Sequence, residues 1–164
     1  MKILFGKLSW LTVSIVCLGF FFFLFLVTHL ILNDLTYNLG LKNQLLSQCP
    51  GTPNCVSSQE INTQNSIQPI TYEDSLRQAK ERIYLVINSM RGTKIIVKDD
   101  LYLHVEFTTQ LLRFIDDVEF FFDESQSLIH VRSVSRRGYW DLGVNRRRVE
   151  TIRSKFEKLK NGND

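Results

Sequence analysis

Charged residues are missing from one long stretch of this 164-residue chain, because residues 8–33 contain no Asp, Glu, Lys or Arg. A helix needs about 20 consecutive apolar residues to cross the hydrocarbon core of a bilayer. Only Lys2 and Lys7 precede the stretch, the first basic residue after it is Lys42, and basic residues favour the cytoplasmic side. We therefore predict a single-pass membrane protein with a cytoplasmic stub at residues 1–7, a transmembrane signal anchor at residues 8–33, and the remainder outside in a periplasm-like compartment.

Sequence motifs of the common enzyme classes are also absent. The chain has no nucleophile elbow, HExxH, P-loop or GxGxxG pattern, which leaves no complete catalytic constellation and no signal for a metal or cofactor. The residues after 33 carry 18 basic and 17 acidic groups, a net of +1. So small a net charge argues against a nucleic-acid partner for the domain as a whole.

Cysteine is scarce, with three in the chain. Cys49 and Cys55 flank a Pro-Gly-Thr-Pro-Asn segment that bends the chain, so the two can form a small-ring disulfide in an oxidising compartment. A zinc pair and a redox pair remain alternatives. Zinc needs about four ligands, however, and a redox dithiol usually has C-x-x-C spacing.

The remaining residues predict one α+β domain. Residues 34–48 carry spaced leucines that indicate a short interfacial helix, and residues 49–70 read as a loop segment, so residues 34–70 form a juxtamembrane and Cys-Pro segment before a domain at 71–164. Periodicity within that domain predicts a helix, a four-stranded antiparallel sheet and a second helix. The expected bounds are a helix at 72–90, strands at 94–98, 101–107, 115–122 and 128–134, and a helix at 145–160.

Three ordered motifs then resemble a known family. They are CPGTPNCVSSQ at residues 49–59, DDVEFFFDE at 116–124 and IHVRSVSRRGYWDLGVNRRRVETIR at 129–153. The chain resembles the membrane-associated family known only as a domain of unknown function, which occurs in exported bacterial proteins and in plastid proteins. The resemblance implies a shared fold and no established activity.

Basic residues gather in the last part of the chain. Residues 131–164 hold 10 basic and 4 acidic groups, net +6, whereas residues 34–130 hold 8 and 13, net −5. Guanidinium groups beside the first amides of a helix can bind phosphate, carboxylate or a lipid headgroup. The alternative is that these arginines pair with acidic residues of neighbouring strands. The candidate anion- or partner-binding residues are Arg132, Ser133, Ser135, Arg136, Tyr139, Asp141, Asn145 and Arg146. In the structural alternative, Arg132 or Arg136 pairs with a strand carboxylate and Asn145 caps the last helix.

A second cluster of polar side chains lies at alternating positions of two predicted strands. His104 and Glu106 occupy one strand, and His130 and Arg132 the other. If these strands are neighbours, two imidazoles and a carboxylate can bind a metal or transfer protons. A solvated sheet face gives the same alternation without any function.

The prediction of function is a choice between classes. We expect a non-catalytic binding or interaction module of the cell envelope, with an envelope protein or an anionic ligand as its partner and the membrane contacted through residues 8–33. An envelope enzyme using the second cluster, or an anion- or lipid-headgroup-binding domain using the arginines, is the alternative.

Overall fold

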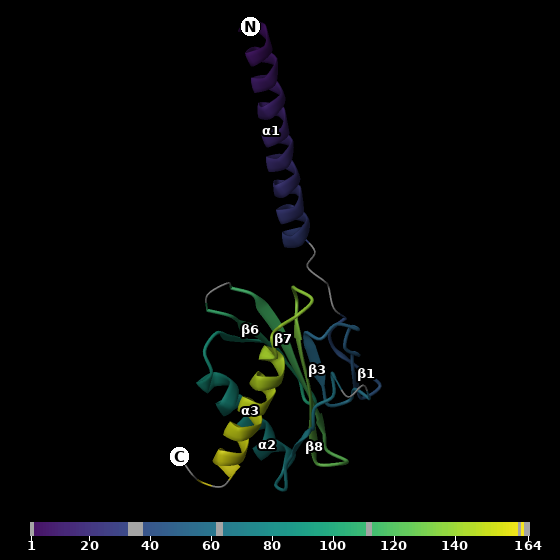
Figure 1. Cartoon of the computed structure of the whole chain (residues 1–164). Coiled ribbons are helices and arrows are strands. Elements are labelled where there is room, and N and C mark those ends of the chain that lie inside the picture. The colour runs from purple at the N-terminus through teal and green to yellow at the C-terminus, as the bar shows by residue number, and fades with distance from the viewer. Residues whose placement is uncertain (1, 33–37, 62–63, 111–112, 161, 163–164) are drawn as a thin grey trace. The chain divides into compact units, whose positions relative to one another are not determined.

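The computed structural model describes residues 2–32, 38–61, 64–110, 113–160 and 162. The chain divides into two compact units, Met1–Leu35 and Thr36–Asp164. The first contains the long helix α1, and the second contains the other helices and all the described strands (Figure 1).

Helix α1 spans Lys2–Leu32. Among the residues that the structure describes, no helix is both long enough and apolar enough to cross a membrane. This finding contradicts the predicted transmembrane anchor at residues 8–33 and the single-pass localisation derived from it. The side chains of the predicted stub at 1–7 lie outside those described.

The second unit contains a six-stranded antiparallel sheet, where the sequence predicted four strands. The order is β3-β8-β7-β6-β5, and β4 also pairs with β8. The strands are β3 (Cys55–Ser57), β4 (Ile70–Thr71), β5 (Thr93–Lys98), β6 (Tyr102–Thr108), β7 (Ile115–Asp123) and β8 (Leu128–Ser135). The four long strands lie where the alternation of apolar residues placed them. The two additional strands have three and two residues, too few to produce such alternation.

Two helices cover one face of this sheet (Figure 1). Helix α2 spans Leu76–Ser89, and helix α3 spans Val144–Lys160. Ser75 and Gln78 form a capping box at the start of α2, so the helix begins four residues later than predicted. The apolar stripes of both helices meet the sheet in a single core that includes Ile83, Ile87, Ile152, Phe156, Val105 and Phe120.

The turn from α2 into β5 depends on Gly92. Its φ of +74° is in the left-handed region, and a Cβ at this position would lie 2.4 Å from the carbonyl oxygen of Thr108. The same two residues are joined by a hydrogen bond from the Thr108 amide to the Gly92 carbonyl oxygen. Glycine therefore lets the start of β5 approach the end of β6.

The opposite face of the sheet carries a small hairpin instead of the predicted interfacial helix. Strands β1 (Leu41–Lys42) and β2 (Leu45–Leu46) are joined through Asn43 and Gln44, both with positive φ. Leu46 packs against Tyr102 and Phe121 of the sheet. The spaced leucines therefore belong to a hairpin, and Leu46 is buried against the sheet. The predicted segment also includes residues 34–37, which lie outside the described part of the chain.

Candidate functional site

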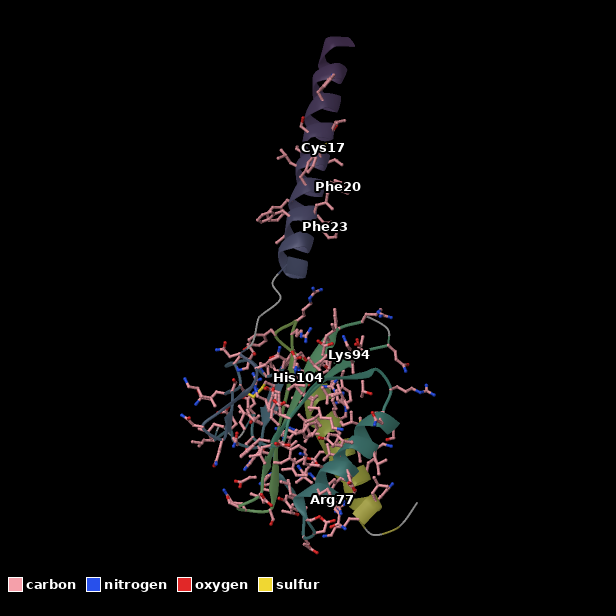
Figure 2. All side chains as sticks on the ribbon, turned by 180° about the vertical axis from the view of Figure 1, so that it is seen from behind. Cys17, Phe20, Phe23, Arg77, Lys94 and His104 are labelled. Atoms are coloured by element: carbon pink, nitrogen blue, oxygen red, sulfur yellow. A yellow bond between two sulfur atoms is a disulfide. The ribbon has the colours of Figure 1, made fainter. Side chains whose placement is uncertain are left out.

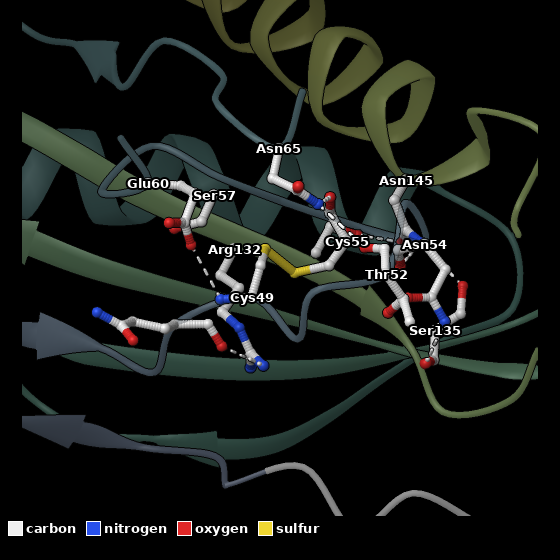
Figure 3. Close-up of a disulfide and its surroundings, with 12 residues drawn as sticks. Cys49, Thr52, Asn54, Cys55, Ser57, Glu60, Asn65, Arg132, Ser135 and Asn145 are labelled. Atoms are coloured by element: carbon white, nitrogen blue, oxygen red, sulfur yellow. Dashed lines mark hydrogen bonds between the residues drawn. A yellow bond between two sulfur atoms is a disulfide. The ribbon is translucent and has the colours of Figure 1, made fainter. Parts of the chain in front are cut away.

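The small-ring disulfide predicted near the start of the second unit is present. Cys49 and Cys55 form a disulfide, which confirms the predicted pairing. Cys55 is buried on β3, and Figure 3 shows the disulfide beside Arg132 of β8. The amide of Cys49 donates to the Glu60 carboxylate at 3.1 Å. Both ends of the loop are therefore fastened to the domain.

The four residues of the second predicted cluster share the sheet face opposite the helices. Figure 2 views the unit from behind and labels His104 on this face. Strand β7 lies between β6 and β8, so His104 and Arg132 face Glu119 from opposite sides. The strands carrying the two histidines are not neighbours, and the four side chains do not converge on one site: His104 and Glu106 share a network, whereas Arg132 and His130 have other partners. No group of three metal-ligating side chains occurs among the described residues.

Arg132 and Glu119 form a buried ion pair at 2.6 Å. The other carboxylate oxygen of Glu119 accepts hydrogen bonds from the Tyr102 hydroxyl at 2.6 Å and from the Gly40 amide at 2.7 Å. Burial raises the pKa of Tyr102 above its ordinary range, and the negative charge of Glu119 raises it further. Arg132 is 1% exposed. The Arg132 guanidinium therefore makes its contacts inside the domain.

Asp117 is the centre of the next polar contact on the same face. Its carboxylate lies 2.7 Å from Nε2 of His104 and accepts hydrogen bonds from Nε and Nη2 of Arg136 at 2.8 Å each. Arg136 also contacts Glu106 at 2.5 Å. Burial raises the pKa of Asp117, but the hydrogen bonds from His104 and Arg136 outweigh it, so the pKa lies below its ordinary value. Arg136, which follows the last residue of β8, thus closes a network with two strands, β6 and β7.

His130 contacts neither of these networks. Its ring stacks on Phe121 with centroids 5.8 Å apart, and its Nδ1 lies 3.2 Å from the Ser58 hydroxyl. Burial lowers the pKa of His130, and the charge of Asp123 opposes this in part. The Ser58 oxygen accepts the Val131 amide at 2.9 Å. The Ser58 hydroxyl thus contacts both the Val131 amide and the His130 ring, and these two contacts hold the chain after β3 against β8.

A third network joins the disulfide loop to α3. The side-chain amide of Asn145 donates to the Asn54 carbonyl at 2.9 Å and to the Ser135 hydroxyl at 2.8 Å. Its carbonyl oxygen accepts the Ser133 hydroxyl at 2.6 Å. Figure 3 shows Asn54, Ser135 and Asn145 meeting beside the loop. Asn145 lies inside α3, so it does not cap the helix as expected.

Asp141 caps α3 instead. Its two carboxylate oxygens accept the amides of Gly143 at 2.8 Å and Asn145 at 2.7 Å. A carboxylate suits this position because the first amides of a helix lack intrahelical partners. Arg148, one turn into the helix, forms an ion pair with Asp116 of β7.

The loop between β8 and α3 exposes large apolar side chains. Tyr139 is 69% exposed, Trp140 71% and Leu142 79%. Its backbone is nevertheless held by hydrogen bonds. The Gly138 carbonyl accepts the Asn54 side chain at 2.5 Å, and the Leu142 carbonyl accepts Nη1 of Arg147 at 2.8 Å.

Two open hollows are both lined by Trp140. One, of about 490 Å³, is also lined by Phe114, Gly138 and Val144. The other, of about 570 Å³, is also lined by residues that include Pro53, Gln64, Leu142 and Arg146. Asp141, the residue after Trp140, lines both hollows as well. We use the name loop surface for Phe114, Tyr139, Trp140, Leu142, Arg146 and Arg147.

Two arginines of the loop surface have neutral partners. Arg146 donates to the carbonyl oxygens of Gln64 at 2.9 Å and Ser66 at 2.8 Å, and Arg147 to that of Leu142. In the described part of the chain, neither has a carboxylate within ion-pair distance. The positive charges of Arg146 and Arg147 therefore have no ion-pair partner among the described residues.

The predicted anion-binding residues are thus divided by the fold. Arg132, Ser133, Ser135, Arg136 and Asn145 make contacts within the domain, and Asp141 caps α3. Tyr139 and Arg146 reach the loop surface. Binding by any of them stays a prediction.

Sequence reasoning missed the most exposed apolar residues of this region. Trp140 and Leu142 lie between Gly138 and Gly143, and large apolar residues enclosed by glycines in a loop were a usable signal. Asn54 gave no such signal, because its partners are 81 and 91 positions away along the chain.

Comparisons with known proteins place the chain in a family. The sequence profile of the family described as "Protein of unknown function (DUF1499)" matches residues 45–156. A search of curated proteins yields no match. The matched range covers more than half of the chain, including the disulfide loop, the whole sheet and most of α3. The predicted resemblance to a family of unknown function is confirmed, and the chain belongs to the DUF1499 family of proteins of unknown function.

Proposed function

We propose that the second unit is a non-catalytic binding module and that the loop surface is where it binds. One observation carries this proposal: three large apolar side chains, Tyr139, Trp140 and Leu142, are exposed on a loop whose backbone is fastened by hydrogen bonds. Exposed apolar clusters on folded domains mark interaction sites more often than isolated apolar residues do. A fastened loop also loses little conformational entropy when it binds.

The polar networks of the sheet support a structural role in preference to catalysis. The carboxylates of Asp117 and Glu119 are each occupied by an arginine and a second donor. Neither carboxylate lines the two hollows beside Trp140. A general base must reach a bound substrate, so these groups give the enzyme alternative little support.

One edge of the sheet offers a weaker docking site than the loop surface. Strand β5 forms that edge, and its register with β6 shifts between Ile95 and Val97. Lys94 and Lys98 also lie on this strand. Bulges and lysines on an edge strand discourage pairing with another chain.

Site-specific photocrosslinking in cells that produce the full chain tests the proposal. A photoreactive phenylalanine analogue replaces Trp140 or Leu142 in separate variants, and Leu85 of α2 in a control. Leu85 is 59% exposed, so it matches the loop residues in access but lies on a different element. We expect discrete crosslinked species from the two loop positions that weaken when Arg147→Gln is added. Equal labelling from all three positions, or none from the loop, would contradict the proposal.

A further inference from the structure

We infer that the ligand of the loop surface is a peptide segment of another protein that carries apolar side chains and at least one carboxylate. This inference rests on the proposed function and names the class of its partner. Three properties of the loop surface lead to it: its shape, its charge and the kinds of side chain that it exposes.

The shape favours an irregular ligand over a flat one. Trp140 lines both of the open hollows. A peptide can place one apolar side chain in each hollow and contact the indole that lines both.

The charge of the loop surface favours an acidic ligand. Arg146 and Arg147 donate to carbonyl oxygens, which are neutral, so their positive charges are not compensated by those contacts. Arg147 is exposed at the edge of the loop. A guanidinium can donate two hydrogen bonds to a carboxylate while another of its N–H groups keeps a hydrogen bond to a carbonyl.

The side chains themselves are of the types that dominate protein interfaces. Trp, Tyr and Arg are the residues most enriched among binding hot spots, and Tyr139, Trp140 and Arg147 bring one of each to the loop surface. Asp141, the acidic residue of the loop, is occupied in capping α3. It is therefore less able to repel an acidic peptide than an unpartnered carboxylate would be.

Peptide display tests this inference directly. The full chain is immobilised and used to select from a phage library of random 12-residue peptides, in parallel with a Trp140→Ser variant. We expect the wild type to enrich sequences with two apolar residues close together and an Asp or Glu beside them, and the variant to enrich none of these. Enrichment of basic sequences, or equal enrichment by both proteins, would overturn the inference.

Binding of the selected peptide is then measured by fluorescence anisotropy. Trp140→Ser should weaken binding by about 30-fold, as truncation of a hot-spot residue does. Arg147→Gln should weaken binding and reduce its dependence on salt, and changing the peptide carboxylate to its amide should have the same effect. The matched controls are Leu85→Ser and Arg77→Gln, both exposed on α2, and they should bind as the wild type does. Equal loss in the controls would overturn the inference.

The remaining outcomes separate this inference from the proposed function. Discrete crosslinks from position 140 together with no enriched peptide would overturn the peptide ligand and leave the binding module standing. Trp140-dependent sedimentation with phosphatidylglycerol vesicles and no enriched peptide would replace the peptide by an anionic lipid surface. A single species of twice the chain mass in light scattering that Trp140→Ser converts to monomer would replace it by a second copy of the chain. The absence of both crosslinks and peptides would remove both proposals.

Discussion

Arg132 and Glu119 face each other across β8 and β7 and form a 2.6 Å ion pair whose side chains are 1% and 0% exposed. The pair lies beneath the segment that contains Gly40 and Gln48, since both residues hydrogen-bond to it. It therefore links three parts of the chain through one buried contact, and its energetic role can be measured.

Removing one partner of this pair should strongly destabilise the domain. Glu119→Gln leaves the buried guanidinium of Arg132 without its opposite charge, which typically costs about 3–5 kcal/mol. Replacing both residues, as in Glu119→Leu with Arg132→Met, should cost much less because no charge stays buried. Urea unfolding followed by circular dichroism measures the free energies of unfolding. A single variant within about 1 kcal/mol of the wild type would contradict this account.

The free energy of unfolding should fall at acid pH, in part because Asp117 becomes protonated. Its pKa in the folded protein is lowered, so its contribution is fully present above the unfolded value of about 3.9 and is lost as the pH falls through the folded pKa. Asp117→Asn should be less stable near neutral pH and should lose part of this acid dependence. Urea unfolding at a series of pH values measures both effects. The same slope below about pH 4 in both proteins would exclude Asp117 as its source.

The disulfide should stabilise the domain by about 2 kcal/mol. Its cysteines are six positions apart, and a loop this short removes only a small part of the entropy of the unfolded chain. The Cys49→Ser, Cys55→Ser double variant is the test, and Cys17→Ser is its control because Cys17 is the free cysteine. Thermal unfolding should show a loss in the double variant alone. An equal loss in the control would attribute the effect to serine substitution in general.

Replacing Leu142 should raise the stability of the domain and weaken its binding. The φ of Leu142 is +53°, a conformation that costs a non-glycine residue about 1–2 kcal/mol. Asn tolerates this region better than Leu, so Leu142→Asn should raise the free energy of unfolding by up to about 1 kcal/mol. The same variant should weaken crosslinking from position 140. A destabilised Leu142→Asn protein would show that the leucine is retained for packing.

The sequence could predict the parts of this fold that depend on local pattern. The long strands and both helices of the second unit follow from apolar periodicity, and Cys49–Cys55 follows from the bent segment between the two cysteines. Strands β3 and β4 depend on pairing with β8 from far along the chain, so no local pattern reveals them. The same limit applied to the histidines. Alternation correctly placed His104 and His130 on one face, but only the strand order shows that β7 separates them.

The arginines illustrate a different limit. Composition identifies a basic region, but it does not distinguish a guanidinium buried beside Glu119 from one exposed beside Leu142. That distinction depends on which strand carboxylates lie within reach, and hence on tertiary register. The exposed fraction of Trp140 is likewise a property of the loop geometry and not of the residue type.

The contact of Gly92 with Thr108 has a consequence for which sequences can adopt this fold. A Cβ at position 92 would overlap a backbone oxygen, and no rotamer of any side chain avoids a clash made by the first carbon. The cost of substitution at position 92 therefore does not grow gradually with side-chain size. A change as small as Gly92→Ala produces the same clash as a change to a large residue. In a saturation library of the chain, position 92 should lose all nineteen replacements together, whereas exposed positions of α2 should accept most of theirs.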